Sequence, residues 1–321
     1  MTGVGEGKPA IILLSMGGPE RLTDVRKFLF NIFSDRALIR LPGGALLQKP
    51  FAFLISALRS KKVQARYEQI GGRSPLLKWS RMQAAQVEEQ LRREIAGVRC
   101  YVGMQYFTPT VREAILKAYA DGCRQFCFLP LYPQFSTATT GSSFATAART
   151  IARLKGVSTV FVKDFHDDEG YVRLLREYIS ANIREDETLL FSAHSLPQKF
   201  VDDGDPYVGQ VRRTAALSAG GREYFVSFQS RTGPVRWVGP DTIDESRRLL
   251  ERKSGGLFVV PVSFVCDHIE TLYEIDIELP KLVGNDAAGR IRRMPMFNGD
   301  QRFTKVLASI ARSRIVNYVK A

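Results

Sequence analysis

Four carboxylates follow an apolar run at helical spacing. The run covers residues 256–265, is rich in β-branched side chains and predicts a buried strand. Beyond it, one helical face at about 100° per residue would carry Asp267, Glu270, Glu274 and Glu278. Glu residues four positions apart on a helix repel each other by about 0.2–0.5 kcal/mol. Because this repulsion is unfavourable, a row of carboxylates just after a strand indicates a site that holds or passes cations or protons.

A structural explanation of the same row stays open at this point. Asp267 and Glu270 have the spacing of a capping box, in which an acid caps the helix and the third residue along returns a hydrogen bond. Glu274 and Glu278 would then belong to an ordinary solvated face. Spacing alone favours this structural explanation. A functional site is favoured only if a second group of reactive residues is expected close to the carboxylates.

The histidines supply such a group. The chain has only three, His166, His194 and His268, and each directly follows a predicted strand. A single histidine is most often structural, but three at the same edge of a sheet point to proton transfer or metal binding. His194 is therefore a candidate base or metal ligand. Its neighbour Ser195 is not a candidate nucleophile, because adjacency in sequence does not give a serine and a histidine the geometry of a catalytic pair.

Composition excludes several classes of protein. The chain has 321 residues, 45% of them apolar, which is enough for two ordinary globular domains. Its net charge of +13 favours an anionic partner. Zinc-finger spacing and an RNA-binding aromatic motif are both missing from the sequence, so nucleic acid is not the expected partner. Because we find neither a signal peptide nor an apolar run near the roughly 20 residues of a membrane span, we expect a cytoplasmic protein.

The cysteines fit an interior role better than a metal cluster. All lie in or beside apolar runs, at Cys100, Cys123, Cys127 and Cys266. We interpret them as buried thiols, because their spacing does not match a metal-binding framework.

Short strand-like runs alternate with helical patterns along the chain, which predicts an α/β fold with parallel sheets covered by helices on both faces. The predicted strands cover residues 10–15, 98–104, 125–131, 158–163, 188–192, 224–228, 256–265 and 291–295. Local similarities in the same order, such as 102–105 with 226–229 and 128–131 with 259–262, indicate that the two halves repeat one plan.

We therefore expect two similar domains, each with a four-stranded parallel sheet flanked by helices. The first would cover residues 1–166, with an insertion at about 20–79, and the second 167–321, with the acidic helix and a C-terminal helix. Ligands of such sheets bind beyond the carboxyl ends of the strands, so the cleft between the domains is the expected site.

The insertion contains an apolar run with a basic end, at residues 41–62. This combination suits contact with an anionic bilayer that the chain does not cross, and an ordinary core helix is the alternative. The glycines at 17 and 18 after the first strand lack both phosphate-loop patterns, so nucleotide binding is not expected.

Several strand-end stretches together resemble the ferrochelatases, the enzymes that insert ferrous iron into protoporphyrin IX. The stretches are LLSMGGPE at 13–20, YEQIGGRSPL at 67–76, LPLYPQFSTATTGS at 129–142, FSAHSLP at 191–197, FQSRTGPVRWVGPDT at 228–242 and FVCDHIETLYEID at 264–276. They follow the family order over nearly the whole chain. The resemblance implies two Rossmann-like halves with the porphyrin in the cleft. It also favours a functional role for the row of carboxylates at 267–278 over the structural explanation.

The resemblance also implies roles for individual residues. His194 matches the pocket histidine and Glu270 the catalytic glutamate that faces it across the macrocycle. Glu274 and Glu278 match an acidic path that leads away, with His268 nearby. The expected catalytic residues are therefore His194, Glu270 and His268, and the expected metal contacts are His194 and the three glutamates. The residues that match the porphyrin pocket or its lip are Met16, Arg59, Tyr67, Ser74, Tyr106 and Trp237. The segment 41–62 matches the lip that rests on the membrane in some members.

This resemblance sets the chemistry that we expect. Insertion of Fe²⁺ into a porphyrin releases two pyrrole protons, and imidazole and carboxylate groups both ligate Fe²⁺ and accept protons. Our hypothesis is that His194 accepts the pyrrole protons while Glu270 helps to deliver iron. Fe²⁺ and protoporphyrin IX are then substrates, and we expect no cofactor and no [2Fe–2S] cluster, because the chain ends at Ala321 without the cysteines of cluster-bearing members. Gln105 stands where some members have arginine.

Three other readings remain. A cobalt chelatase of corrin synthesis shares the fold, but the long lip and the DHIETLYE stretch argue against it. A coproporphyrin-specific ferrochelatase is nearer, although the apolar lip favours the membrane-soluble protoporphyrin. A two-lobed carrier protein would need neither the histidine base nor the acidic helix. We expect a cytoplasmic enzyme, with a peripheral position on the inner face of the membrane as an option.

Overall fold

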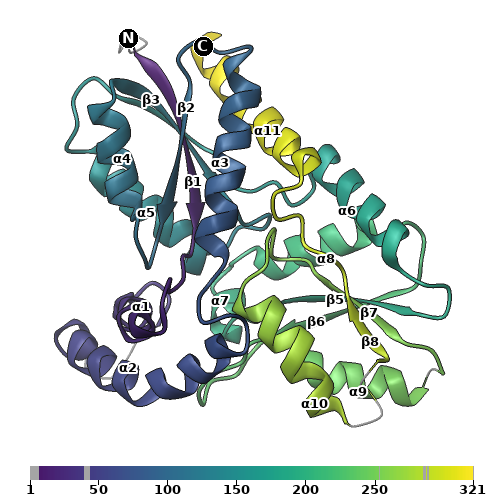
Figure 1. Cartoon of the computed structure of the whole chain (residues 1–321). Coiled ribbons are helices and arrows are strands. Elements are labelled where there is room, and N and C mark those ends of the chain that lie inside the picture. Colours follow the sequence, from purple (N-terminus) through teal and green to yellow (C-terminus); the bar gives the residue numbers. More distant parts are fainter. Residues whose placement is uncertain (1–6, 40–43, 253, 285–286, 288, 321) are drawn as a thin grey trace. The chain divides into compact units, whose positions relative to one another are not determined.

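The computed structural model describes residues 7–39, 44–252, 254–284, 287 and 289–320. Its described part divides into two compact units (Figure 1). The first comprises residues 1–131, 137–164 and 299–321, and the second comprises residues 132–136 and 165–298. Each unit is built around its own parallel sheet of four strands.

The sheet of the first unit has the strand order β2-β1-β3-β4, with every pair parallel. Its strands are β1 (Lys8–Ser15), β2 (Arg99–Met104), β3 (Cys123–Pro130) and β4 (Ser158–Phe161). The central strand β1 reads as an unbroken apolar run because both of its faces are covered: residues 10–14 have no exposed surface.

Helices cover both faces of this first sheet (Figure 1). The helices of the first unit are α1 (Val25–Ser34), α2 (Gly44–Glu68), α3 (Leu76–Arg92), α4 (Val111–Ala120), α5 (Ser142–Ile151) and α11 (Gln301–Lys320), with short turns of helix at η1 (Leu22–Asp24) and η2 (Thr137–Gly141). Helices α1 and α2 pack on each other. One face of β1 and β3 packs on α4 through Ile12, Leu14 and Phe128, with Ala147 of α5 in the same cluster. Strand β1 also contacts α3, and β3 contacts α11.

Phe128 is the side chain whose loss we expect to weaken this unit most clearly. It has no exposed surface, and its ring stacks on Phe161 with centroids 4.7 Å apart. Truncation of a buried phenylalanine to alanine removes apolar contacts and leaves a cavity, so Phe128→Ala should lower the free energy of unfolding by about 3–5 kcal/mol. Denaturant unfolding checks this value, and Phe128→Leu is the matched control with a smaller loss. A loss below about 1 kcal/mol would contradict the packing described for this face.

The second sheet repeats the same plan, with the order β6-β5-β7-β8. Its strands are β5 (Thr188–His194), β6 (Tyr224–Gln229), β7 (Leu257–Pro261) and β8 (Ile291–Arg293). In both sheets the first strand along the chain lies between the second and the third. The predicted fold is confirmed: two similar α/β units, each with a four-stranded parallel sheet flanked by helices.

The helices of the second unit are α6 (Glu169–Asn182), α7 (Gln198–Asp202), α8 (Tyr207–Ser218), α9 (Thr242–Arg252), the π-helix η3 (Glu270–Glu278) and α10 (Leu279–Val283). One core cluster joins Leu249 of α9, Val259 of β7 and Ile275 of η3. This packing fixes the acidic π-helix against the sheet.

The division into units differs from the predicted one at two places. The segment 132–136, which continues β3, belongs to the second unit, where Gln134 Nε2 donates to Thr214 Oγ1 at 3.1 Å. Helix α11 was expected in the second half but groups with the first. It packs on α3, and Arg312 of α11 lies 2.8 Å from the Glu94 carboxylate. Order along the chain misled the prediction, because the amphipathic pattern of a last helix does not say which sheet it covers.

Helix α2 has an inverted distribution of side chains. Its buried residues are mostly small or polar, at Gln48, Ala52, Ser56, Ser60 and Tyr67. Its exposed residues include large apolar ones, at Leu46, Leu47, Phe53, Leu54 and Leu58. The buried amide of Gln48 donates to the carbonyls of Phe33 and Ile39 at 2.6 and 2.9 Å. The core-helix alternative therefore does not describe α2 in this structure, since its apolar side chains point outward.

Two further points concern the predicted lip and the membrane. Residues 41–43 of the predicted lip lie outside the described residues. Within the part of the chain that is described, we find no helix with the length and apolar character needed to cross a bilayer.

Candidate active site

Three neighbouring strands of the second unit bring the candidate residues together. Strand β5 ends at His194, which pairs in register with Gln229 at the end of β6. On the other side of β5, Ser192 is in register with Pro261, the last residue of β7. Parallel strands have their carboxyl ends at the same edge, so the residues that follow β6 and β7 lie beside His194.

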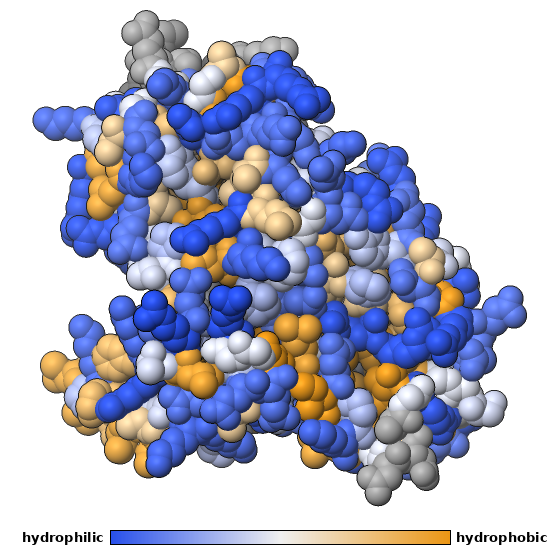
Figure 2. All heavy atoms as spheres, in the orientation of Figure 1, coloured by the Kyte–Doolittle hydropathy of each residue, from blue (hydrophilic) through white to orange (hydrophobic). Residues whose placement is uncertain are grey.

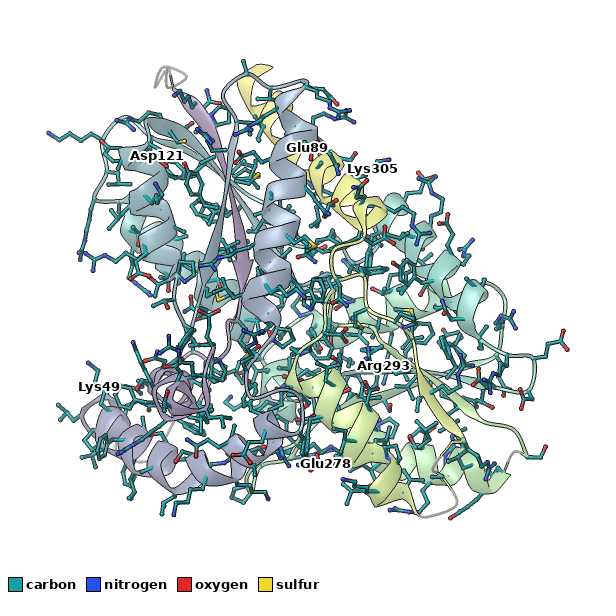
Figure 3. The ribbon with its side chains drawn as sticks, in the orientation of Figure 1. Lys49, Glu89, Asp121, Glu278, Arg293 and Lys305 are labelled. Atoms are coloured by element: carbon teal, nitrogen blue, oxygen red, sulfur yellow. The ribbon has the colours of Figure 1, made fainter. Side chains whose placement is uncertain are left out.

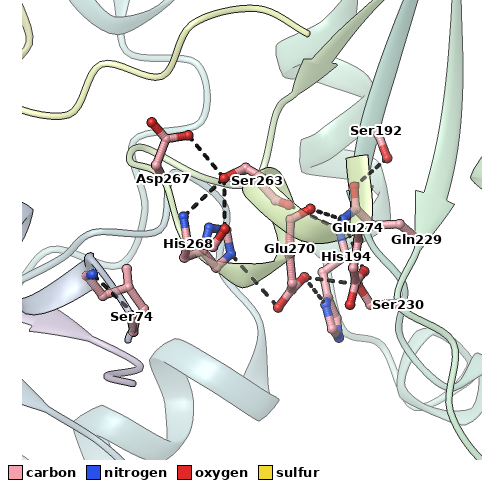
Figure 4. A network of polar contacts seen from close by, with 12 residues as sticks. Ser74, Ser192, His194, Gln229, Ser230, Ser263, Asp267, His268, Glu270 and Glu274 are labelled. Atoms are coloured by element: carbon pink, nitrogen blue, oxygen red, sulfur yellow. Dashed lines mark hydrogen bonds and ion pairs between the residues drawn. The ribbon is translucent and has the colours of Figure 1, made fainter. Parts of the chain in front are cut away.

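His194 and Glu270 are in direct contact (Figure 4). His194 Nδ1 lies 2.7 Å from Glu270 Oε2. The Glu270 side chain is 13% exposed and that of His194 is 37% exposed. An imidazole held by a largely buried carboxylate is a pair that can accept a proton and stabilise the resulting charge.

Each of the two groups shifts the pKa of the other. Burial alone would lower the pKa of His194, but the nearby Glu270 carboxylate outweighs it, so that the pKa of His194 is raised above its ordinary value. Burial alone would raise the pKa of Glu270, but His194 and further donors bring that pKa down to about 2. Glu270 is therefore ionised near neutral pH, and it is the charge partner of the histidine.

The helix that carries the acids is wound more widely than predicted. Residues 270–278 form a π-helix, in which the N–H of Leu279 bonds to the carbonyl of Glu274, five residues earlier. Such helices are rare and occur often at functional sites. Glu270, Glu274 and Glu278 all lie on this helix, and Figure 3 labels Glu278 where it passes into α10.

The capping-box explanation of Asp267 and Glu270 is wrong. The backbone N–H of Asp267 donates to Asn298 Oδ1 at 2.8 Å and not to Glu270. The Asp267 carboxylate accepts from Thr271 and Asn298, at 3.1 and 2.7 Å, and pairs with Arg293 at 3.0 Å. Asp267 is thus a structural anchor of the turn, and Glu270 is left to bind His194.

Ser230, the first residue after β6, contacts two of the glutamates. Its Oγ lies 3.0 Å from Glu270 Oε2 and 2.5 Å from Glu274 Oε2. The preceding Gln229 donates from Nε2 to the carbonyl of Glu270 at 3.0 Å and accepts from Ser192 through Oε1 at 2.7 Å. A polar network at the ends of β5 and β6 therefore supports the start of the π-helix (Figure 4).

His268 lies on the other side of Glu270. Its Nε2 is 3.9 Å from Glu270 Oε1, and its ring packs on Phe264 with centroids 4.4 Å apart. Burial lowers the pKa of His268 despite the nearby acids, and Nδ1 is buried with no hydrogen-bond partner among the described residues. The predicted His268, His194 and Glu270 are thus brought together, with the glutamate between the two imidazoles.

The positions of His194 and Glu270 differ from the expected arrangement in one respect. The resemblance implied that the two side chains face each other across the macrocycle. Both belong to the same unit, however, and their contact at 2.7 Å leaves no room for a ring between them. The expected arrangement across a macrocycle is therefore not the one in this structure.

Most residues predicted to contact the substrate belong to the first unit. Tyr67, Ser74 and Tyr106 are buried, with 2%, 6% and 5% of their surface exposed, and the Tyr106 hydroxyl donates to Asp35 at 2.8 Å. Arg59 lies on α2, with its guanidinium 5.7 Å from the centre of the Phe33 ring. Burial lowers the pKa of Arg59. These residues stay predictions as substrate contacts.

Two more of the predicted substrate residues lie in loops. Met16 directly follows β1, where its carbonyl accepts from the N–H of Tyr106 at 3.0 Å. Trp237 lies between β6 and α9 in the second unit and forms an isolated bridge with Pro197. The indole N–H of Trp237 is buried and has no partner among the described residues.

Sequence reasoning missed the hydroxyl and amide groups around the pair. Ser263 Oγ accepts from the N–H of His194 at 3.1 Å, and Gln229 and Ser230 hold the π-helix. Gln229 and Ser230 directly follow the predicted strand 224–228 and lie in the stretch 228–242 that carries the resemblance, but neither signal gives them a role. No sequence pattern distinguishes serine and glutamine residues that hold a helix in place from those of an ordinary loop.

Comparison with known proteins defines first the class of fold. The sirohydrochlorin chelatase SirB from Bacillus subtilis subspecies spizizenii, in complex with cobalt, superposes with a TM-score of 0.57 at 13% identity, covering 97% of this chain and 96% of that one. SirB from Bacillus subtilis with Fe³⁺ gives 0.56 at 14% identity, with 98% of each chain covered. The fold is that of the class II chelatases.

The family follows from sequence. The family model described as Ferrochelatase matches residues 8–315. A ferrochelatase of Geotalea daltonii is 40% identical over 316 residues, 95% of this chain and 98% of that one. One of Synechocystis sp. is 38% identical over 317 residues, 95% of this chain and 82% of that one. The chain belongs to the ferrochelatase family, as its motifs predicted, and is an enzyme that inserts a metal ion into a porphyrin in heme biosynthesis.

Proposed function

We propose that the enzyme inserts Fe²⁺ into protoporphyrin IX to form protoheme, the last step of heme biosynthesis. The observation that carries this proposal is the contact between His194, at the end of β5, and Glu270, the first residue of the π-helix that follows β7, at 2.7 Å. Both groups are ligands that suit Fe²⁺, and both accept protons. Met16, Arg59, Tyr67, Ser74, Tyr106 and Trp237 are the proposed substrate contacts.

The reaction exchanges one divalent cation for two pyrrole protons, so a base is needed at the ring. His194 is that base in this proposal, and it acts in its neutral form. Glu270 stays ionised, and its negative charge stabilises the imidazolium that forms. Glu274 and Glu278 continue the line of carboxylates along the π-helix and, with His194 and Glu270, provide contacts for the incoming metal. Fe²⁺ is a substrate here, and the proposal needs no resident cofactor.

The choice of protoporphyrin over coproporphyrin rests on helix α2. Coproporphyrin carries four carboxylates and protoporphyrin two, so protoporphyrin is the form that enters a bilayer. Leu46, Phe53 and Leu58 of α2 are 90%, 60% and 74% exposed. The apolar side chains of α2 give orange spheres at the lower left of Figure 2, beside the basic ones. An outward apolar face next to positive charge suits a substrate that is delivered from a membrane.

The test is anaerobic mixing of the protein with Fe²⁺ and each porphyrin in turn, followed by absorbance. The proposal expects conversion of protoporphyrin to the spectrum of the iron porphyrin, with a higher kcat/KM than for coproporphyrin. Faster turnover of coproporphyrin would overturn the choice of substrate. Porphyrin binding without conversion would indicate a carrier protein and overturn the proposed reaction.

We also propose that the enzyme binds the cytoplasmic face of the membrane through α2, and this can be tested separately from the reaction. The double variant Phe53→Ser/Leu58→Ser should bind vesicles that contain anionic lipid at least about tenfold more weakly than the wild type, because full burial of each apolar side chain contributes about 1.5–3 kcal/mol. Sedimentation with vesicles measures this binding.

Leu116 provides the matched control for that measurement. It lies on α4 and is 39% exposed, so Leu116→Ser removes an exposed apolar side chain away from α2. Equal binding by the wild type and the double variant, or an equal loss in the Leu116 variant, would show that α2 is not the contact surface.

A further inference from the structure

Ser230 has a backbone conformation that serine rarely adopts. Its φ is 68°, in the left-handed region where a Cβ atom is disfavoured. Among the described residues, Asn298 is the only other residue besides glycine with a positive φ. Both side chains bind the acidic segment, since Asn298 Nδ2 donates to Asp267 at 2.7 Å and Ser230 contacts Glu270 and Glu274. Strain of this kind persists where the surrounding contacts require the side chain.

The contacts of Ser230 define what it does. The register of β5 and β6 places Ser230 just beyond the pair His194 and Gln229. Its one hydroxyl lies within hydrogen-bond distance of both carboxylates, at 3.0 Å from Glu270 and 2.5 Å from Glu274. A hydroxyl has a single hydrogen, so Ser230 reaches both carboxylates at once only by sharing that hydrogen between them in a bifurcated hydrogen bond, with the shorter contact to Glu274.

We propose that Ser230 is a positioning residue for metal delivery, which fixes the separation of the Glu270 and Glu274 carboxylates through its hydroxyl. The two acids would otherwise repel each other and turn apart toward other donors. Held at one distance, they present their oxygens to a cation in a fixed geometry, which reduces the reorganisation needed when the cation arrives. This inference rests on the proposed function and adds a specific residue to it.

Gln229 strengthens the argument, because it fixes the backbone on which Glu270 stands. Its Nε2 donates to the carbonyl of Glu270 at 3.0 Å, while its Oε1 accepts from the buried Ser192 at 2.7 Å. The same Nε2 lies 3.4 Å from Glu274 Oε2, so Gln229 also contacts one of the two carboxylates. Ser230 contacts the carboxylates of both Glu270 and Glu274.

Two substitutions separate the hydroxyl from the backbone conformation. Ser230→Gly removes the hydroxyl and relieves the left-handed backbone, whereas Ser230→Ala removes the hydroxyl and retains the strain. Ser218→Ala is the matched control, because Ser218 is a buried serine of the same unit whose hydroxyl donates to the carbonyl of Thr214 at 2.7 Å. The assay is anaerobic iron insertion, with Fe²⁺ varied at fixed porphyrin and porphyrin varied at fixed Fe²⁺, together with thermal unfolding.

We expect both Ser230 variants to lose about ten- to hundredfold in kcat/KM for Fe²⁺, with the KM for porphyrin within about twofold of the wild type. The glycine variant should unfold at a temperature equal to or above that of the alanine variant. Ser218→Ala should retain the wild-type kinetics. Binding of Fe²⁺ alone, measured by equilibrium dialysis without porphyrin, should weaken in both Ser230 variants.

Three outcomes would overturn the inference. Unchanged Fe²⁺ kinetics in both variants would remove any role for the hydroxyl. A defect in the alanine variant with normal kinetics in the glycine variant would assign the effect to backbone strain. An equal rise of KM for both substrates would indicate general disruption. A wild-type protein that inserts no iron contradicts the proposed function instead, and the dialysis measurement still tests the contact of Ser230 with the metal site.

Discussion

His194→Ala is expected to lower kcat for iron insertion by about 10²–10⁴-fold, the usual contribution of a positioned acid–base group. The substitution removes the imidazole whose Nδ1 lies 2.7 Å from Glu270, and it leaves that carboxylate without its charge partner. Porphyrin must then lose its protons to water or to a carboxylate, and both are ordinarily weaker bases than imidazole. Steady-state kinetics with Fe²⁺ and protoporphyrin under anaerobic conditions measure the loss.

His166→Ala is the control for this prediction. His166 belongs to the same unit, and its Nε2 lies 3.8 Å from the Asp167 carboxylate, away from the contacts of Glu270. This variant should keep kcat within about threefold of the wild type, because the imidazole of His166 pairs with Asp167 and not with the Glu270 carboxylate that binds His194. Normal turnover in His194→Ala, or an equal loss in His166→Ala, would contradict the assignment of the base.

Glu270→Gln is expected to reduce kcat/KM by about 10²-fold and to move the acidic limb of the pH profile to lower pH. In the wild type, burial works against the charged imidazole but Glu270 outweighs it, and the pKa of His194 is raised. Glutamine removes the negative charge and leaves burial largely unopposed, so the pKa of His194 should fall.

The sign of the shift follows from the role of the base. His194 accepts a proton only when it is neutral, so activity is lost as the pH falls below its pKa. A lower pKa in Glu270→Gln therefore extends the remaining activity to lower pH. Titration of His194 by NMR in both proteins provides the matching equilibrium measurement. A limb that moves to higher pH, or does not move, would contradict the electrostatic coupling of the pair.

The fold could be predicted from the sequence largely because parallel strands buried on both faces leave a strong pattern. The strands β1, β5 and β7 contain uninterrupted apolar runs, at residues 9–14, 189–191 and 257–261, and these runs are followed by polar residues or end at proline. Each predicted strand is present with bounds that differ by a few residues. The unit to which α11 and residues 132–136 belong could not be predicted, because periodicity reports that a segment is buried and does not report by which partner.

The candidate site could be predicted in part for a related reason. His194 and Glu270 are reactive residue types at strand ends, and the rule that parallel strands present these ends at one edge brings them together. The capping-box spacing of Asp267 and Glu270 was ambiguous, and the acceptor of the Asp267 N–H resolved it: this acceptor is Asn298, which lies 31 positions further along the chain. A local pattern cannot anticipate a partner at that separation.

The π-helix and Ser230 had no signal of their own. A sequence pattern at 100° per residue does not distinguish α-helical from π-helical winding over nine residues. The left-handed backbone of Ser230 is set by tertiary contacts, whereas glycine would have marked such a position in the sequence. Both features arise where the polar groups at the ends of β5 and β6 meet the acidic segment.

The crystal structure of the enzyme with protoporphyrin bound tests the central claim most directly. Our account predicts that the pyrrole nitrogens lie within hydrogen-bond distance of the free Nε2 of His194, or one water molecule away, with Glu270 on the same side of the ring and still bound to Nδ1. A porphyrin whose nitrogens lie far from His194, or a ring inserted between His194 and Glu270, would contradict it.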